Sequence, residues 1–97
     1  MPSQRNAVMT PTLNLVVLRS SDIERAMAFY SKLGLHFTKH RHGTGAEHYS
    51  AELGGAVFEL YPENKGGPSS LGTRIGFAVS SVDESIRALA DYPTAVV

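Results

Sequence analysis

The sequence predicts an α+β fold in which a βαβββ module is followed by a truncated second module, made of a βα unit and a strand fragment. Three observations predict it. Apolar and β-branched residues form several runs of strand length. Two Ser-x-x-Glu patterns each follow such a run and precede apolar residues at helical spacing. A Gly-Gly pair joins two of the runs. The repeated order of strand, cap and helix indicates duplication of one unit.

The first strand and helix are predicted over residues 12–19 and 22–33. The strand places Leu13, Leu15, Val17 and Arg19 on one face, because successive side chains alternate. The helix begins with the Ser-x-x-Glu pattern at Ser21 and stops at Gly34.

Three further strands complete the first module. Residues 35–42 and 48–53 form a predicted hairpin with a glycine-containing loop. The pair Gly54-Gly55 suits a two-residue turn of type I′ or II′ and leads into a strand over residues 56–61.

The rest of the chain begins the same order again. We expect a flexible tail over residues 1–11, then one domain over 12–97. In that domain, module one covers 12–62, a Pro/Gly/Ser-rich linker covers 63–72, and a partial module two covers 73–97. In the second module, residues 73–79 are a predicted strand, a Ser81-x-x-Glu84 cap starts a helix that ends at Tyr92-Pro93, and residues 94–97 begin another strand.

Composition excludes several classes of function. Nine basic and nine acidic residues give a net charge of zero, and no basic cluster offers a surface for nucleic acid or anionic lipid. No apolar stretch approaches the roughly 20 residues of a membrane-spanning helix, and the first residues lack the apolar region of a signal peptide. We therefore expect a cytoplasmic protein with no nucleic-acid or membrane partner. The absence of cysteine removes disulfides and thiol chemistry.

Three segments resemble the vicinal oxygen chelate superfamily, which includes glyoxalase I, bleomycin-resistance proteins and extradiol dioxygenases. They are LNLVVLRSSDIERAMAFYSKLGL over residues 13–35, GGAVFELYP over 54–62 and GTRIGFAVSSVDESIRAL over 72–89. The resemblance implies paired βαβββ modules whose strands curl into a cup with a divalent metal inside. It thus agrees with the order of elements predicted from the residues.

The metal ligands that the resemblance implies are mostly missing. Leu15 stands where such proteins carry a His or Gln, and Phe77 stands where they carry a His. Glu59 matches a ligand, and the last Glu would lie in strands that this chain does not contain. One carboxylate cannot replace three or four protein ligands. We expect no cofactor, with a divalent metal at Glu59 as the alternative.

The candidate ligand-binding residues are those that would line such a cup, namely Leu15, Val17, Arg19, Glu59, Phe77 and, at its rim, His48. Leu15 and Phe77 either form an apolar pocket or simply pack the core. Glu59 is either paired with Arg19 or half exposed, because a buried unpaired carboxylate is costly. Arg19 either holds a substrate carboxylate, as the resemblance implies, or closes a salt bridge.

The histidines gather in one predicted hairpin. His36, His40 and His42 alternate along its first strand, and His48 opens the second. They form either a metal site with Glu47 and Glu52 or a solvated edge. No nucleophile motif or phosphate-binding loop accompanies them.

A cup of one and a half modules predicts a partner. We expect a homodimer, with exchange of the second module between chains as one way of closing the cup. Three functions stay open: a glyoxalase/bleomycin-resistance-like protein that binds a small organic ligand, a metal-dependent lyase or dioxygenase with a rearranged site, and an inactive or interaction-only remnant.

Overall fold

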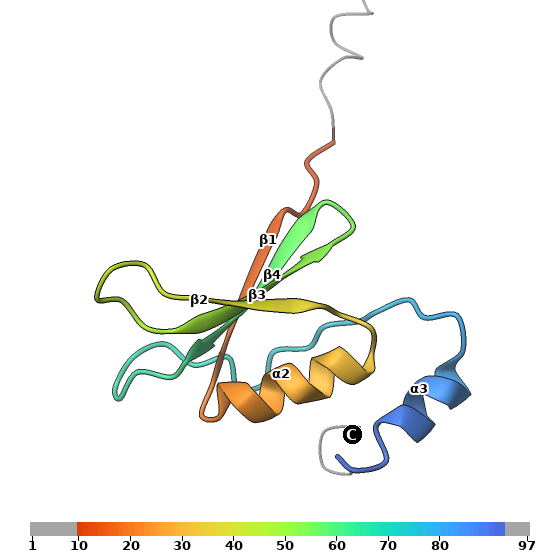
Figure 1. Ribbon diagram of the computed structural model, residues 1–97. Helices are drawn as coiled ribbons and strands as arrows, with labels where there is room; N and C mark the ends of the chain where they lie inside the picture. Colours follow the sequence, from red (N-terminus) through yellow and green to blue (C-terminus); the bar gives the residue numbers. More distant parts are fainter. Residues whose placement is uncertain (1–9, 93–97) are drawn as a thin grey trace, which may run out of the picture.

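The computed structural model describes residues 10–92, which form an α+β fold with a four-stranded sheet. Its elements along the chain are β1 (Leu15–Ser20), α2 (Ile23–Lys32), β2 (Phe37–His40), β3 (His48–Leu53), β4 (Ala56–Pro62) and α3 (Val82–Ala88). The predicted βαβββ module is confirmed (Figure 1). Most of the predicted tail, residues 1–9, and the predicted strand fragment at 94–97 lie outside the described residues.

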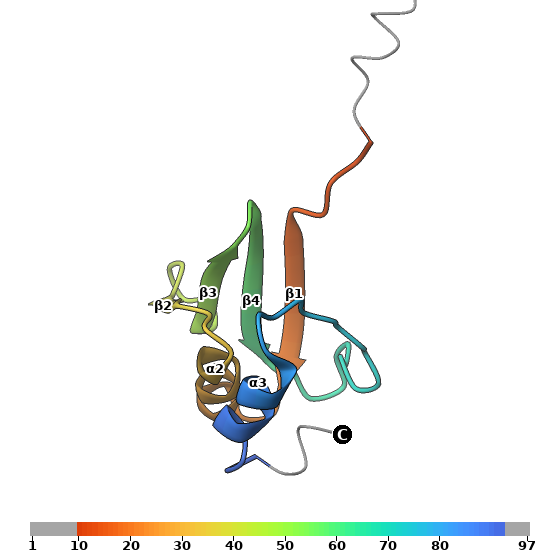
Figure 2. The ribbon, with the colours of Figure 1, turned by 90° about the vertical axis from the view of Figure 1, so that its right-hand side faces the viewer.

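The sheet has the strand order β1-β4-β3-β2, so that β1 and β2 form its edges (Figure 2). β1 and β4 pair in parallel, with Val17 beside Glu59 and Arg19 beside Tyr61. β4 pairs with β3, and β3 with β2, in antiparallel fashion. The predicted turn at Gly54-Gly55 joins β3 to β4, and both glycines have the positive φ angles, 57° and 89°, that such a turn requires.

One face of the sheet packs against α2 and forms the core. Phe58 and Leu60 of β4 are 2% and 1% exposed, and they alternate with the side chains that point to the other face. Their neighbours in the core are Val16, Leu18, Ile23, Ala26, Met27, Tyr30, Leu33, Leu35, Phe37, Tyr49, Ala51 and Leu53. The helix therefore covers one side of the sheet only (Figure 1).

The helix caps follow the sequence closely but not completely. Ser81 caps α3 as predicted, because its Oγ accepts a hydrogen bond from the Glu84 N–H at 3.1 Å. In α2 the capping residue is Asp22, whose Oδ1 accepts from the Arg25 N–H at 3.0 Å, and not Ser21. Asp22 is itself held by Ser20, whose Oγ accepts from its N–H. Within residues 10–92 no helix is both long and apolar enough to cross a membrane.

Residues 73–79 do not form the predicted strand. They run without strand pairing beside the core, where Phe77 lies 6.0 Å from the Phe58 ring and 6.1 Å from the Tyr30 ring. Ile75 stays 37% exposed. A strand needs a neighbouring strand to satisfy its backbone N–H and C=O groups, and none of the described strands is paired with this segment. The segment is thus rich in residues that favour strands but does not form a strand in the single chain.

Glu24 of α2 makes polar contacts with two strands of the sheet. The Tyr49 hydroxyl of β3 donates a hydrogen bond of 2.7 Å to Glu24 Oε1, and Lys39 Nζ of β2 lies 3.2 Å from Glu24 Oε2. The hydrogen bond from Tyr49, followed by the contact with Lys39, lowers the pKa of the Glu24 carboxyl. The same hydrogen bond raises the pKa of the Tyr49 hydroxyl. This contact therefore stabilises the charged carboxylate in the folded protein.

The Glu24 contact predicts a pH-dependent stability. A lowered pKa in the folded state contributes stability above the unfolded pKa, near 4.5, and loses it as the pH falls through the folded value. We expect Glu24→Gln to unfold at a lower urea concentration than the unsubstituted protein at pH 7. This difference should shrink steadily below about pH 4.5. The matched control is Glu52→Gln at an exposed position of β3. An equal and pH-independent loss in both variants would contradict the assignment.

Candidate functional site

The face of the sheet that α2 does not cover carries most of the predicted site residues. We call it the open face. From β1 it carries Leu15 and Val17, which are 52% and 38% exposed although they are aliphatic. Strand register places the following residues with them: Arg19, Val57, Glu59, Tyr61, His48, Ser50 and His40. The predicted residues Leu15, Val17, Arg19, Glu59 and His48 therefore share one surface.

Glu59 is the central charge of the open face. Ser50 lies opposite it on β3 and donates a hydrogen bond of 2.7 Å from its hydroxyl to Glu59 Oε2. The same carboxylate oxygen lies 3.9 Å from His48 Nε2. The Glu59 side chain is 20% exposed, so it is largely shielded from water, and it accepts a short, charge-assisted hydrogen bond from Ser50. Ser50 was missed by the sequence analysis, although the two-residue turn at Gly54-Gly55 fixes this register.

A row of flat groups crosses the open face from β3 to β1. The His48 ring stacks on the Tyr61 ring at 4.2 Å between centroids, with 7° between the planes. The Arg19 guanidinium lies over the same Tyr61 ring at 5.2 Å. Arg19 also donates from Nη1 to the Pro62 carbonyl at 3.4 Å. The predicted pairing of Arg19 with Glu59 is not found, because the register of β1 and β4 sets Val17 beside Glu59.

Phe77 is not part of this surface. Its ring packs against Phe58 and Tyr30 on the side of the sheet that α2 covers. The structure therefore separates Phe77 from the five candidate residues on the open face and packs its ring against the core.

Three of the four histidines cluster at the edge of the open face. His40 of β2 lies opposite His48 in the register, and His42 follows β2 by two residues. The three ring centroids are 5.4 to 6.1 Å apart. His36 precedes β2 and is exposed, and Glu47 contacts Lys39 and Arg41 instead of a histidine.

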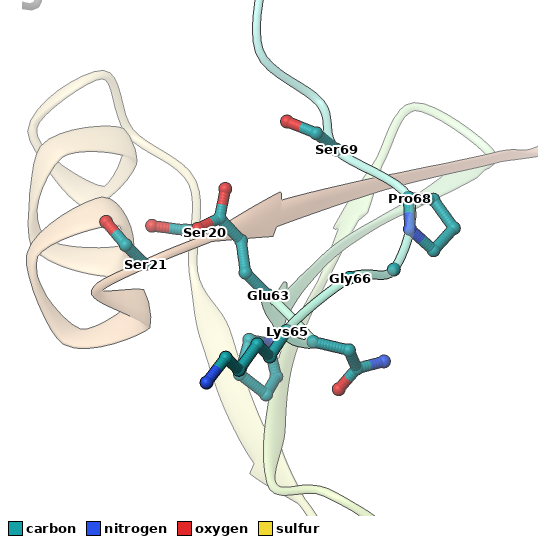
Figure 3. Close-up of a pocket in the computed structure, with 10 residues that line it drawn as sticks. Ser20, Ser21, Glu63, Lys65, Gly66, Pro68 and Ser69 are labelled. Atoms are coloured by element: carbon teal, nitrogen blue, oxygen red, sulfur yellow. The ribbon is translucent and has the colours of Figure 1, made fainter.

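Two hollows lie mainly away from the open face. The first, of about 480 Å³, is bounded by linker residues including Glu63, Lys65 and Ser69 together with Ser20 and Ser21 (Figure 3). The second, of about 660 Å³, lies beside α2 and the 70–77 segment and includes both Phe77 and Arg19 in its wall, so it reaches the edge of the open face at Arg19. Neither of these two hollows is lined by Leu15, Val17 or Glu59.

The comparison with protein families agrees with the fold. The family model of the Glyoxalase/Bleomycin resistance protein/Dioxygenase superfamily matches residues 12–94. The chain therefore belongs to this superfamily. No curated protein matches the sequence.

The described residues do not fit the metal site that this superfamily implies. Leu15 and Phe77, at two of the matching positions, have no ligating atom, and Phe77 packs on the opposite side of the sheet from Glu59. Within residues 10–92 no three side chains of His, Asp or Glu are already arranged to hold one ion. Glu59 is the matching position that keeps a ligand, and its present partners are Ser50 and His48.

The contact of Ser50 with Glu59 predicts an energetic coupling. In a double-mutant cycle of Ser50→Ala and Glu59→Gln, unfolding in urea should give a coupling energy of about 1 kcal/mol, because one hydrogen bond to a largely shielded carboxylate is lost. As the control, Ser50→Ala combined with Glu52→Gln should give a coupling near zero. Equal couplings in the two cycles would refute the assigned contact.

Proposed function

We propose that the protein binds a small organic ligand on the open face of its sheet. The observation that carries the proposal is the gathering of exposed aliphatic residues, an arginine and a shielded carboxylate on one uncovered surface. Leu15, Val17 and Val57 offer apolar contact, while Arg19, Glu59 and His48 offer a few polar groups. Such a mixture is typical of small-molecule sites, in which apolar contact supplies affinity and polar groups fix orientation.

The charge distribution favours an apolar ligand with an acidic group. Arg19 uses one nitrogen for the Pro62 carbonyl and lies over Tyr61, which leaves further N–H donors in its planar fork. The neighbouring side chain on the same strand face is Val17. An anion held by Arg19 would thus have its apolar part on Val17 and Leu15.

A second copy of the chain is the proposed cover of this face. Aliphatic side chains left in water lose the stabilisation that burial would give. Val82 and Ile86, one turn apart on α3, are also 64% and 49% exposed. A homodimer would bury both surfaces, and exchange of residues 73–97 between the copies would give residues 73–79 a strand neighbour.

The alternative is a metal-dependent lyase or dioxygenase with a rearranged site. The observation that favours it is the distance of 3.9 Å between Glu59 Oε2 and His48 Nε2, two atoms of ligating type. An inactive or interaction-only protein is the third candidate, and it predicts neither ligand nor metal binding.

Ligand binding is tested with 8-anilinonaphthalene-1-sulfonate, an apolar anion, by fluorescence and by amide chemical shifts of the full chain. We expect Val17→Asp and Arg19→Gln each to weaken binding by about tenfold, or ~1.4 kcal/mol. Leu71→Asp is the matched control, since Leu71 is apolar and 94% exposed but lies in the linker. Equal loss in the control, or shifts centred on Ile75 and Phe77, would contradict the proposed place of binding.

Dimer formation is tested by light scattering coupled to size exclusion. We expect twice the chain mass at micromolar concentration, and a shift to the monomer in Ile86→Asp, because a charge would be buried at the interface. Ser31→Asp adds the same charge at an exposed position of α2 and should stay dimeric. A stable monomer at micromolar concentration would overturn the proposal.

A further inference from the structure

Two opposite charges flank one apolar residue on the open face. Val17 lies beside Glu59 in the register of β1 and β4, and Arg19 is the next residue of β1 on the same face. We propose that the ligand is a small zwitterion, with an acidic group for Arg19, a cationic donor such as an ammonium group for Glu59, and an apolar body on Val17. This inference rests on the proposed binding of an organic ligand to the open face, and it names the chemical class of that ligand.

Glu59 keeps one carboxylate oxygen free for a ligand. Its Oε2 accepts the Ser50 hydroxyl at 2.7 Å and lies 3.9 Å from His48 Nε2. No donor among residues 10–92 forms a hydrogen bond with the other oxygen, Oε1. Because no fully buried side-chain nitrogen or oxygen of these residues lacks a partner, Oε1 is open to solvent. A ligand can therefore reach Oε1, while the hydrogen bond from Ser50 holds the carboxylate in place.

Arg19 is held in place and still has donors to offer. Its Nη1 donates to the Pro62 carbonyl at 3.4 Å, and its guanidinium lies over the Tyr61 ring at 5.2 Å. His48 stacks on the same ring, with 4.2 Å between centroids. The remaining N–H groups of the guanidinium donate to no residue among 10–92. A guanidinium with free N–H groups suits a carboxylate, because the planar fork matches two oxygens at once.

The charges of the open face disfavour a ligand that is only an anion. Glu59 and the exposed Glu52, which lies beside Val57 in the register, are the acidic strand residues of this face. Arg19 is its basic strand residue, because Lys39 of β2 contacts α2 instead. An anion at Arg19 would bring a second negative charge near Glu59, which disfavours binding. A zwitterion gives both Arg19 and Glu59 a partner of opposite charge.

The strand register also limits where the two charges of the ligand lie. Arg19 is two residues along β1 and one strand across from Glu59, which puts their Cα atoms about 8 Å apart. The Arg19 guanidinium is held over Tyr61, on the side of Arg19 that faces away from the row of Glu59. Val17 lies at the corner between the two charges and is 38% exposed. The two groups of the ligand should therefore lie at opposite ends of its apolar body and not on one carbon atom.

The test compares two acids of matched shape on the full chain. In trans-4-(aminomethyl)cyclohexanecarboxylate, an ammonium and a carboxylate lie at opposite ends of an apolar ring. In trans-4-ethylcyclohexanecarboxylate, a methyl group replaces the ammonium. Affinities are measured from amide chemical shifts. We expect the amino acid to bind about fivefold more tightly, with shifts at Val17 and Glu59, because it gains a charge-assisted hydrogen bond.

Three variants assign the groups that recognise the ligand. Glu59→Gln should make the two acids bind equally, because the carboxylate that prefers the ammonium is gone. Glu52→Gln is the matched control: it removes the same charge from an exposed position of the same face and should keep the preference. Arg19→Gln should weaken both acids by about tenfold and leave their ratio unchanged. Circular dichroism of each variant shows whether the fold is kept.

The outcomes separate this inference from the proposed function. If neither acid shifts residues of the open face, the proposed function fails and the inference fails with it. If both acids bind to the open face of the unsubstituted protein with equal affinity, the proposed function stands and the inference is overturned. A preference that persists in Glu59→Gln, or that Glu52→Gln removes to the same extent, also overturns the inference.

Discussion

The parallel pairing of β1 with β4 is the constraint on which the rest of the structure depends. It brings the first strand of the module beside the last, after α2 has carried the chain from β1 to β2 at the opposite edge of the sheet. The register sets Val16 beside Phe58 and Leu18 beside Leu60, which builds the core under the helix. Because strand side chains alternate, the same register must place Leu15, Val17 and Arg19 together on the opposite face. The core and the candidate site therefore come from one pairing.

The second consequence is an imbalance between the two faces. The covered face has α2, the segment with Phe77 and the Tyr49–Glu24 hydrogen bond. The open face has no covering element among residues 10–92, although part of it is aliphatic. Full burial of an exposed aliphatic side chain contributes about 1.5–3 kcal/mol, and Leu15 and Val17, at 52% and 38% exposed, gain only part of that in the single chain. Segment 73–79, which has no strand pairing, likewise leaves Ile75 37% exposed.

Much of the fold could be predicted from the sequence because local patterns determine it. Alternation identified the strands, the cap at Ser81 began α3, and Gly54-Gly55 made the turn. The strand at 73–79 could not be predicted correctly from composition, since strand formation depends on a neighbour at a distance in the chain. Strand parity predicted that five candidate residues would share one face of the sheet, and they do. Strand parity could not predict the place of Phe77, because alternation within one segment does not determine which side of the sheet that segment packs against. The contact of Glu59 with Ser50 was not predicted, although the two-residue turn at Gly54-Gly55 fixes the register that makes it. The stacking of His40 on His48 depends on a longer loop, whose register the sequence does not determine.

The polar groups of the open face limit what can cover it. Glu59 has one hydroxyl donor in Ser50 and an imidazole at 3.9 Å, and its side chain keeps 20% of its surface exposed to solvent. A purely apolar cover would remove that water and leave oxygen lone pairs without donors, at a cost comparable to the gain from burying Leu15 and Val17. A favourable cover must therefore be mixed, with apolar atoms over the β1 side and a donor or cation near Glu59. Electrostatic complementarity at Glu59 and Arg19 would therefore discriminate among apolar covers of this face more strongly than shape alone.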